Sequence, residues 1–355
     1  MQVMRSPTLY RRLTPRQALG VMALLAVALA YCLAVSGGEP WTRAGERGGD
    51  VALFEQVEQR LRGGEPYYDA MASELRSRGY QTRSVLNWRT PLHLSLIARL
   101  PSRGSAWVLV VIVTFAAIAM LFLGMWAEGQ YLPVILWVPL GFASFASLMP
   151  GALMYSEVWA GALIAASAGA YSLRMWRTGA AAGILALFFR ELALPYVLIS
   201  LLLAWRRSRR SEIGVLLIGM AGYSIYFALH ALAVTSRMTP IDLEASWTQV
   251  WIRFGGVRFL LTASRVGMLL ACPLWATALY LPFAVLGLAG VPSPIGSRLL
   301  LTVGAYLAAF SVLGRPVQFY WGGVYAPLLG LGAAWSAPAC YDLVRAILAR
   351  RAKTD

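Results

Sequence analysis

Long apolar runs and short arginine-rich connections alternate along the chain. Runs of roughly 20 apolar residues recur over most of its length, and a run of that length suits a transmembrane helix. The predicted spans are 18–36, 105–127, 131–148, 153–173, 213–235, 266–290, 299–313 and 324–347. This pattern predicts an all-α polytopic membrane protein.

A further apolar run, 179–205, is interrupted by polar residues. Arg190 and Glu191 lie near its middle, and Pro195 follows them. A charged pair is costly at the centre of a bilayer, and proline breaks a helix. The run therefore predicts either one interrupted span or two short half-helices that meet at residues 190–195.

The distribution of arginine favours two half-helices. A single span would place the basic clusters 206–210 and 350–353 outside the cell. A re-entrant hairpin places both clusters inside, together with Arg174, Arg177 and Arg298, and so obeys the positive-inside rule throughout. The sequence thus predicts about ten helical segments, including a broken hairpin, with both termini in the cytoplasm.

The segment 37–104 is the most polar part of the chain. It holds eight of the 16 acidic residues. Apolar residues at helical spacing predict a short helix over 51–62, with Asp50 at its N-cap position, and a second short helix over 69–78. A later segment, 241–264, combines aromatic and basic residues in the manner of a helix that lies at the outer membrane interface.

Composition narrows the class of protein. Of 355 residues, 59% are hydrophobic, which is too many for a soluble domain. We therefore expect a single integral membrane domain over 1–355, with a first transmembrane helix at 17–36, an extracytoplasmic loop at 37–104, the remaining bundle at 105–349 and a cytoplasmic tail at 350–355.

Charge, cysteine and histidine exclude other classes. The net charge of +15 does not indicate nucleic-acid binding, because the arginines flank apolar spans instead of gathering on one soluble face. Three cysteines and two histidines, all far apart in the sequence, indicate neither a disulfide framework nor a metal centre.

Several short motifs combine carboxylates, arginines and aromatic residues next to the predicted spans. They are Asp50…Phe54…Gly64-Glu65-Pro66-Tyr67, Tyr155-Ser156-Glu157, Phe189-Arg190-Glu191 and Arg315…Phe319-Tyr320-Trp321-Gly322-Gly323. This arrangement resembles the GT-C superfamily of membrane glycosyltransferases, which use polyprenyl-phosphate-linked sugars. The chain departs from larger members in lacking a C-terminal soluble domain and an Asp-x-Asp pair.

The resemblance implies a GT-C-like bundle and a reaction at the extracytoplasmic face of the bacterial cytoplasmic membrane. A sugar would pass from a polyprenyl-phosphate donor to the hydroxyl of a glycan, lipid or protein acceptor. The resemblance gives Asp50 the role of general base. The resemblance assigns no cofactor here and leaves a divalent metal open, although no Asp-x-Asp pair supports one.

Each other candidate residue has a chemical and a structural interpretation. Glu157 is either a second carboxylate that orients the acceptor or an exposed glutamate at a helix start. Arg89, Arg190 and Arg315 suit a phosphate, because a guanidinium is a planar fork of donors. Arg190 and Glu191 could instead form an ion pair that fixes the hairpin.

Three residues are candidates for supporting roles. His93 lies before the second span and could equally be an ordinary loop or interface histidine. Tyr67 and Tyr320 could stack on a sugar ring, although an aromatic belt at the membrane interface predicts the same residue type.

Two other functions remain open. A transporter or lipid flippase would predict polar residues within the spans and inverted repeats, and neither pattern is evident. A non-catalytic scaffold for lipid-linked substrates is the third possibility.

Overall fold

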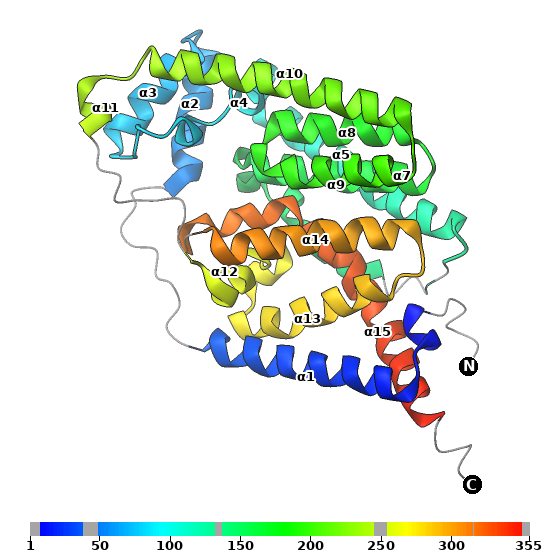
Figure 1. Cartoon of the computed structure of the whole chain (residues 1–355). Coiled ribbons are helices and arrows are strands. Elements are labelled where there is room, and N and C mark those ends of the chain that lie inside the picture. Colours follow the sequence, from blue (N-terminus) through cyan, green and yellow to red (C-terminus); the bar gives the residue numbers. More distant parts are fainter. Residues whose placement is uncertain are drawn as a thin grey trace.

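The computed structural model describes residues 8–37, 49–130, 132, 137–244, 254–314 and 316–349. Over these residues the protein is helical and has no strands, which confirms the predicted all-α class. Most of the long helices run side by side in a slanted bundle, and a group of shorter helices lies at one end (Figure 1).

Among the described residues, four helices are long and apolar enough to cross a membrane: α1 (Pro15–Ser36), α5 (Arg103–Ala127), α10 (Arg210–Thr235) and α14 (Pro294–Val312). Much of their apolar surface faces outward, as at Ile218, which is 74% exposed. Exposed apolar surface on this scale suits contact with lipid, so the structure is consistent with a membrane protein.

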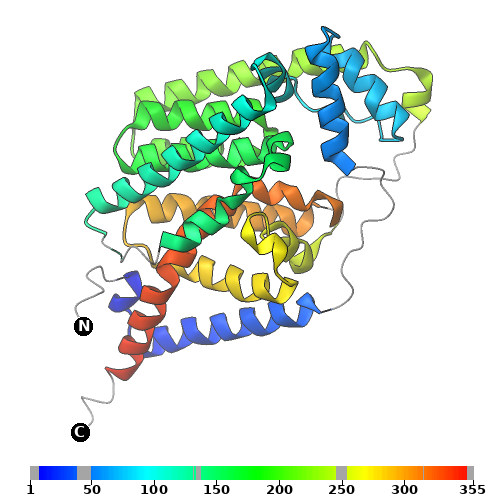
Figure 2. The same cartoon turned by 180° about the vertical axis from the view of Figure 1, so that it is seen from behind.

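The run 179–205 forms two helices, α8 (Trp176–Phe189) and α9 (Leu194–Arg206). Arg190 takes an extended backbone at the end of α8, and one short 3-10 turn, η6 (Glu191–Ala193), precedes α9. Pro195 lies in the first turn of α9, where a missing N–H is tolerated. The two helices then lie side by side (Figures 1 and 2).

The central helix α7 (Ser156–Ser172) is buried along nearly its whole length. Its small residues allow close contact with neighbouring elements. A Cβ atom on Gly161 would lie 2.0 Å from the carbonyl oxygen of Gly323, which no side chain tolerates. Glycine at this position therefore sets the closest approach of α7 to η8 (Pro316–Val324).

Helices α13 (Leu274–Gly290) and α15 (Ala326–Leu348) are packed in the same way. A Cβ atom on Gly287 would lie 1.8 Å from the carbonyl oxygen of Gly332. At the start of the described chain, Thr8 donates hydrogen bonds to Asp342 of α15 from its backbone nitrogen (2.7 Å) and its hydroxyl (2.9 Å).

Two predicted spans are not continuous helices. In 131–148 the structure has α6 (Val138–Ala143) and the 3-10 turn Phe145–Leu148, while 131 and 133–136 lie outside the described residues. In 266–290 the helix α13 starts only at Leu274. Gly267 has φ +129° and packs against backbone oxygens, so the chain turns sharply there although its composition is apolar.

The polar segment forms the helices at one end of the bundle: α2 (Gly49–Arg62), α3 (Tyr67–Ser77) and α4 (Leu92–Arg99). The two predicted short helices are therefore confirmed. The predicted interface helix is seen only as α11 (Pro240–Glu244) and α12 (Gly256–Ala263), because 245–253 lie outside the described residues. The remaining 3-10 turns are Leu9–Arg12, Val85–Trp88, Pro150–Met154 and Met268–Ala271.

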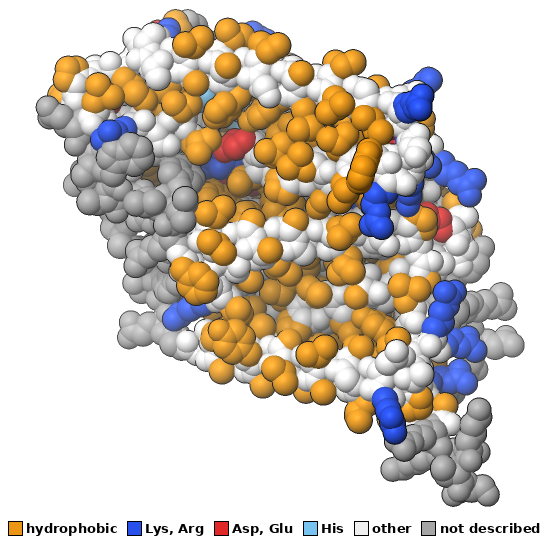
Figure 3. All heavy atoms as spheres, in the orientation of Figure 1, with side chains coloured by type: hydrophobic (Ala, Val, Ile, Leu, Met, Phe, Trp, Pro, Cys, Tyr) orange, Lys and Arg blue, Asp and Glu red, His pale blue; other side chains and the backbone are white. Residues whose placement is uncertain are grey.

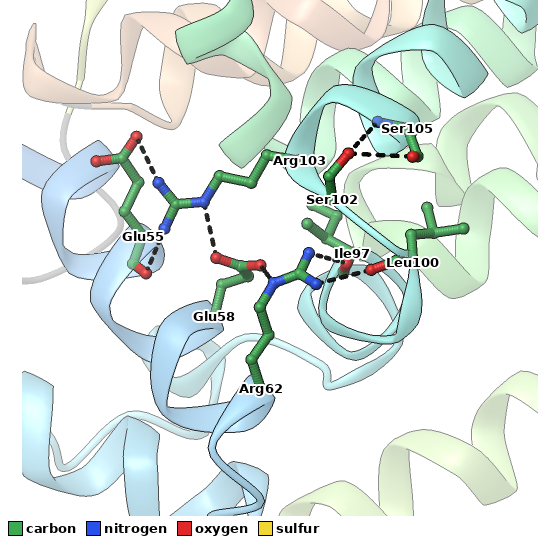
Figure 4. A network of polar contacts seen from close by, with 8 residues as sticks. All are labelled: Glu55, Glu58, Arg62, Ile97, Leu100, Ser102, Arg103 and Ser105. Atoms are coloured by element: carbon green, nitrogen blue, oxygen red, sulfur yellow. Dashed lines mark hydrogen bonds and ion pairs between the residues drawn. The ribbon is translucent and has the colours of Figure 1, made fainter.

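Ion pairs fix α2 against the rest of the protein (Figure 4). Glu58 is 1% exposed and pairs with Arg62 and, at 2.8 Å, with Arg103 at the start of α5. Arg62 also donates to the carbonyl oxygens of Ile97 (2.8 Å) and Leu100 (2.7 Å). This network joins α2 to α4 and α5 and thereby positions the first turn of α2.

Candidate active site

A buried carboxylate lies at the start of α7. Glu157 is 1% exposed, so the interpretation as an exposed helix-start glutamate is wrong. Nη1 of Arg89 donates to its Oε1 at 3.0 Å, and Nε of Arg190 lies 2.8 Å from the same oxygen. Two guanidinium groups therefore offset the cost of burying this charge.

Arg190 joins two carboxylates at the break between α8 and α9. Its side chain is 2% exposed, and Nη1 also contacts the carboxylate of Glu191. The ion pair that was one interpretation of these two residues is therefore present. Arg190 is thus enclosed by protein at the point where the helix is interrupted, whereas Glu191 keeps 22% of its side chain exposed.

Arg89 is held in a strained backbone conformation. Its φ is +53° and its ψ 152°, a region that residues other than glycine rarely adopt and that costs about 1–3 kcal/mol. Its Nη2 donates to the hydroxyl of Tyr320 at 3.2 Å. Burial alone would lower the pKa of Arg89, but Glu157 and Tyr320 raise it above its usual value, so the group stays charged.

Two tyrosines support the arginine. The hydroxyl of Tyr67 donates to the carbonyl oxygens of Trp88 (3.0 Å) and Arg89 (3.2 Å). Tyr320 stacks on Tyr155 with ring centroids 4.8 Å apart. Tyr67 and Tyr320 are each 8% exposed, so both belong to the interior instead of an exposed aromatic belt.

His93 lies in α4 and is 4% exposed, so it is neither a loop nor an interface residue. Its Nε2 lies 3.0 Å from the carbonyl oxygen of Leu153, which can only accept, so Nε2 carries the proton. Burial lowers the pKa of His93 to about 4. The ring is therefore neutral at pH 7 and offers no positive charge to a phosphate.

Asp50 lies in the first turn of α2 and not at its N-cap, because the helix begins at Gly49 with φ +62°. Its Oδ1 accepts a hydrogen bond from the hydroxyl of Tyr80 at 2.8 Å. Asp50 is also among the charges that raise the pKa of Arg89, after the larger effects of burial and of Glu157. It therefore lies near the cluster without a direct ion pair to it among the described residues. Arg315 lies outside the described residues.

Arg89, Glu157, Arg190 and Glu191 together are called the charged cluster below, and its two arginines line a small cavity. The cavity has a volume of about 10 Å³, which is room for about one water molecule. Phe54, Thr90 and Ser156 also line it.

Neither Thr90 nor Ser156 was a candidate residue on sequence grounds, although Ser156 belongs to the motif Tyr155-Ser156-Glu157. Thr90 directly follows Arg89 and Ser156 directly precedes Glu157, so their position next to a candidate residue was the sequence signal that could have indicated them. Tyr80, which binds Asp50, comes from beyond the end of α3, and no motif indicated it.

Within the described part of the chain, no group of three or more His, Cys, Asp or Glu side chains could hold a metal ion. The arrangement instead offers fixed guanidinium donors beside carboxylates, a combination that can bind an oxyanion and accept a proton.

Comparisons of the chain with protein-family models, with curated proteins and with solved structures give no match. The function must therefore be inferred from the residues and their geometry.

Proposed function

We propose that the protein is a GT-C-type membrane glycosyltransferase that moves a sugar from a polyprenyl-phosphate donor to an acceptor hydroxyl. The observation that carries the proposal is the buried contact of Glu157 with both Arg89 and Arg190. These residues come from distant parts of the chain, and Arg89 adopts a strained backbone to reach the contact. Strain of this kind is concentrated at functional sites.

The proposed topology places the charged cluster on the extracytoplasmic side of a bacterial cytoplasmic membrane. The polar helices α2, α3 and α4 lie at the same end as the cluster, and His93 of α4 lines the small cavity beside it. Basic side chains gather at the opposite end of the bundle (Figure 3). The positive-inside rule makes that end cytoplasmic, together with both termini.

In the proposed reaction, Asp50 takes the proton of the acceptor hydroxyl. The acceptor oxygen then bonds to the anomeric carbon of the sugar as the bond from that carbon to the phosphate oxygen breaks. Arg89 and Arg190 stabilise the negative charge that the departing phosphate gains, because each guanidinium has five N–H donors and its carboxylate partners occupy only some of them. Glu157 holds both arginines in place and is the second carboxylate available to orient the acceptor.

The cavity of about 10 Å³ is too small for a sugar. Donor binding must therefore be coupled to an opening of the cluster. Tyr67 and Tyr320 would then be the aromatic surfaces nearest to the incoming sugar.

Asp50→Asn tests the proposal. The purified protein is given radiolabelled polyprenyl-phosphate hexose and pentose donors, and transfer to an acceptor extract is measured. Turnover should fall by about 10²–10⁴-fold, the usual contribution of a general base, with little change in thermal stability. Asp69→Asn is the matched control, because Asp69 belongs to the same loop and is 50% exposed in its pair with Arg237.

Full turnover by a folded Asp50→Asn variant would remove Asp50 as the base and leave Glu157 as the next carboxylate to test. If the unchanged protein moves donor lipid across a vesicle membrane without transferring its sugar, the protein is a transporter. Donor binding with neither activity would indicate a scaffold.

A further inference from the structure

A second and much larger cavity lies at the basic end of the bundle. Its volume is about 940 Å³. Three turns surround it: the turn between α7 and α8, the turn between α9 and α10, and the turn between α13 and α14. It is therefore separated from the charged cluster by the length of α8.

The lining of this cavity is strongly cationic. Five arginines face two glutamates, which gives a net formal charge of +3. The arginines are Arg174, Arg207, Arg209, Arg210 and Arg298. Helix dipoles do not make the cavity positive, because α8, α10 and α14 begin here while α5, α7, α9 and α13 end here. The guanidinium groups determine the field.

Arg298 is the most informative of these residues, because it is buried without an acidic partner. Its exposed fraction is 4%. It lies 3.6 Å over the ring of Tyr171 and donates to the hydroxyl of Ser200 at 2.6 Å. Among the described residues no carboxylate lies within 4.0 Å of its guanidinium. A buried cation of this kind is stabilised by an anion that enters the cavity.

In the turns around the cavity, an arginine is present although the local backbone conformation is unfavourable for it. Arg174 has φ +62° and follows α7 at a position where glycine is the usual residue. Ser208, between two of the cavity arginines, has φ +54°. The local backbone conformation at position 174 disfavours arginine, so it does not explain why an arginine is present there.

Membrane topology alone does not account for this arrangement. The positive-inside rule requires arginines near the ends of spans, where they can remain in water. It requires neither a guanidinium buried against an aromatic ring nor a cavity of this size that several arginines line.

We propose that this cavity binds the phosphate group of an anionic ligand, with Arg298 at its base and Arg174 and Arg207 at its rim. The phosphate could belong to a lipid head group or to a soluble phosphate compound. Exposed apolar side chains beside the rim, Trp205 (68%) and Met175 (47%), would contact the acyl chains of a lipid. The proposal does not depend on the transfer reaction.

The test measures binding of two probes to the full-length protein in neutral detergent: phosphatidylglycerol in mixed micelles, followed by native mass spectrometry, and inorganic pyrophosphate, followed by calorimetry. The main variant combines Arg174→Gly with Arg207→Gln, because both side chains are exposed and their removal should leave the fold intact. It should weaken binding at least about tenfold, the effect of losing charge-assisted contacts. Arg298→Gln should do the same, provided that its melting temperature shows a folded protein.

Arg206→Gln is the matched control, since Arg206 lies in the same turn region but does not line the cavity, and it should change affinity less than about twofold. If the unchanged protein binds phosphatidylglycerol but not pyrophosphate, the cavity is a lipid site. If it binds both probes, the phosphate itself is the ligand. The proposal is overturned if neither probe binds the unchanged protein, or if Arg206→Gln loses as much affinity as the double variant.

Discussion

Among the described residues, each end of the bundle has one arginine with a positive φ. Arg89 has φ +53° and Arg174 has φ +62°. The first is buried and donates to Glu157 at 3.0 Å, while the second is exposed on the rim of a large cavity. Arginine with a positive φ therefore occurs in two different electrostatic environments. One arginine is paired with a buried carboxylate, and the other lines a cationic cavity.

The two ends of the bundle differ in the balance of charged residues and in the volume of the cavity. In the charged cluster, two arginines meet two glutamates, and the cavity beside them is about 10 Å³. At the basic end the lining carries a net charge of +3 around about 940 Å³. The cluster is neutral and closed, so a ligand must displace existing contacts. The basic end has both charge and room for an anion without rearrangement.

Removal of the central carboxylate should have the largest effect on stability. Glu157→Gln keeps the shape of the side chain but leaves Arg89 and Arg190 without their shared acidic partner. Breaking a buried pair in this way costs about 3–5 kcal/mol. Unfolding in detergent, followed by circular dichroism, measures the change.

Glu55→Gln is the control for this change, because Glu55 is 42% exposed in its pair with Arg103 and an exposed pair contributes about 1 kcal/mol or less. If the two variants lose the same free energy of unfolding, burial does not make the contacts of Glu157 more stabilising than the exposed pair of Glu55.

The neutral His93 should make stability depend on pH at the cluster end. The pKa of His93 is about 4 in the folded protein against a usual 6.5, so the unfolded chain binds a proton over a range in which the folded protein does not. Stability is therefore lost as the pH falls from about 6.5 to about 4, by about 3 kcal/mol in total. His93→Gln, which can still donate to Leu153, should lack this part of the acid sensitivity. Parallel pH dependence of melting in both proteins would refute the assignment.

Backbone strain at Arg89 can be separated from its charge. Arg89→Gly and Arg89→Ala both remove the guanidinium, but only glycine adopts this conformation readily. The glycine variant should be more stable than the alanine variant by about 1–2 kcal/mol, because the greater freedom of glycine in the unfolded chain offsets part of the relief. Chemical denaturation of the pair gives the difference directly. An alanine variant as stable as the glycine variant would show that the conformation is not strained.

The smallest effect is expected at the basic end. Arg174→Gly should leave stability unchanged or raise it by up to about 1 kcal/mol, since no buried partner is lost and the left-handed conformation becomes favourable. Arg177→Gly, the same substitution within α8, should instead destabilise by about 0.5–1 kcal/mol. The melting temperature of Arg174→Gly should therefore stay unchanged or rise while that of Arg177→Gly falls, and a similar fall in both would contradict the comparison.

Much of the fold could be predicted from local patterns. Apolar periodicity placed α1, α5, α10, α14 and α15 close to their observed bounds, and Arg190 with Pro195 predicted the break between α8 and α9. Hydropathy failed where the backbone turns within apolar sequence, as at Gly267. Such turns depend on the packing of distant backbone atoms, which a local pattern does not contain.

The candidate site was less predictable than the fold. Residue type indicated Glu157, Arg89 and Arg190 separately, but their contact with one another depends on elements far apart in the chain. The partner of Asp50, Tyr80, could not be predicted because its position follows from the packing of α2 against α3. The large cavity has no motif at all, since it consists of three turns that become neighbours only after folding.

The glycine contact between α7 and η8 has a consequence for the space around the charged cluster. Gly161 lies one helical turn from Glu157 on the same face of α7, and Gly323 lies three residues from Tyr320. A single methyl group at Gly161 would move the two elements apart and widen the space between the polar groups without altering any of them. If the protein is the proposed transferase, the polar groups and the spacing of the elements that carry them are set by different positions, so mutation could alter the size of the accepted molecule and preserve the chemistry.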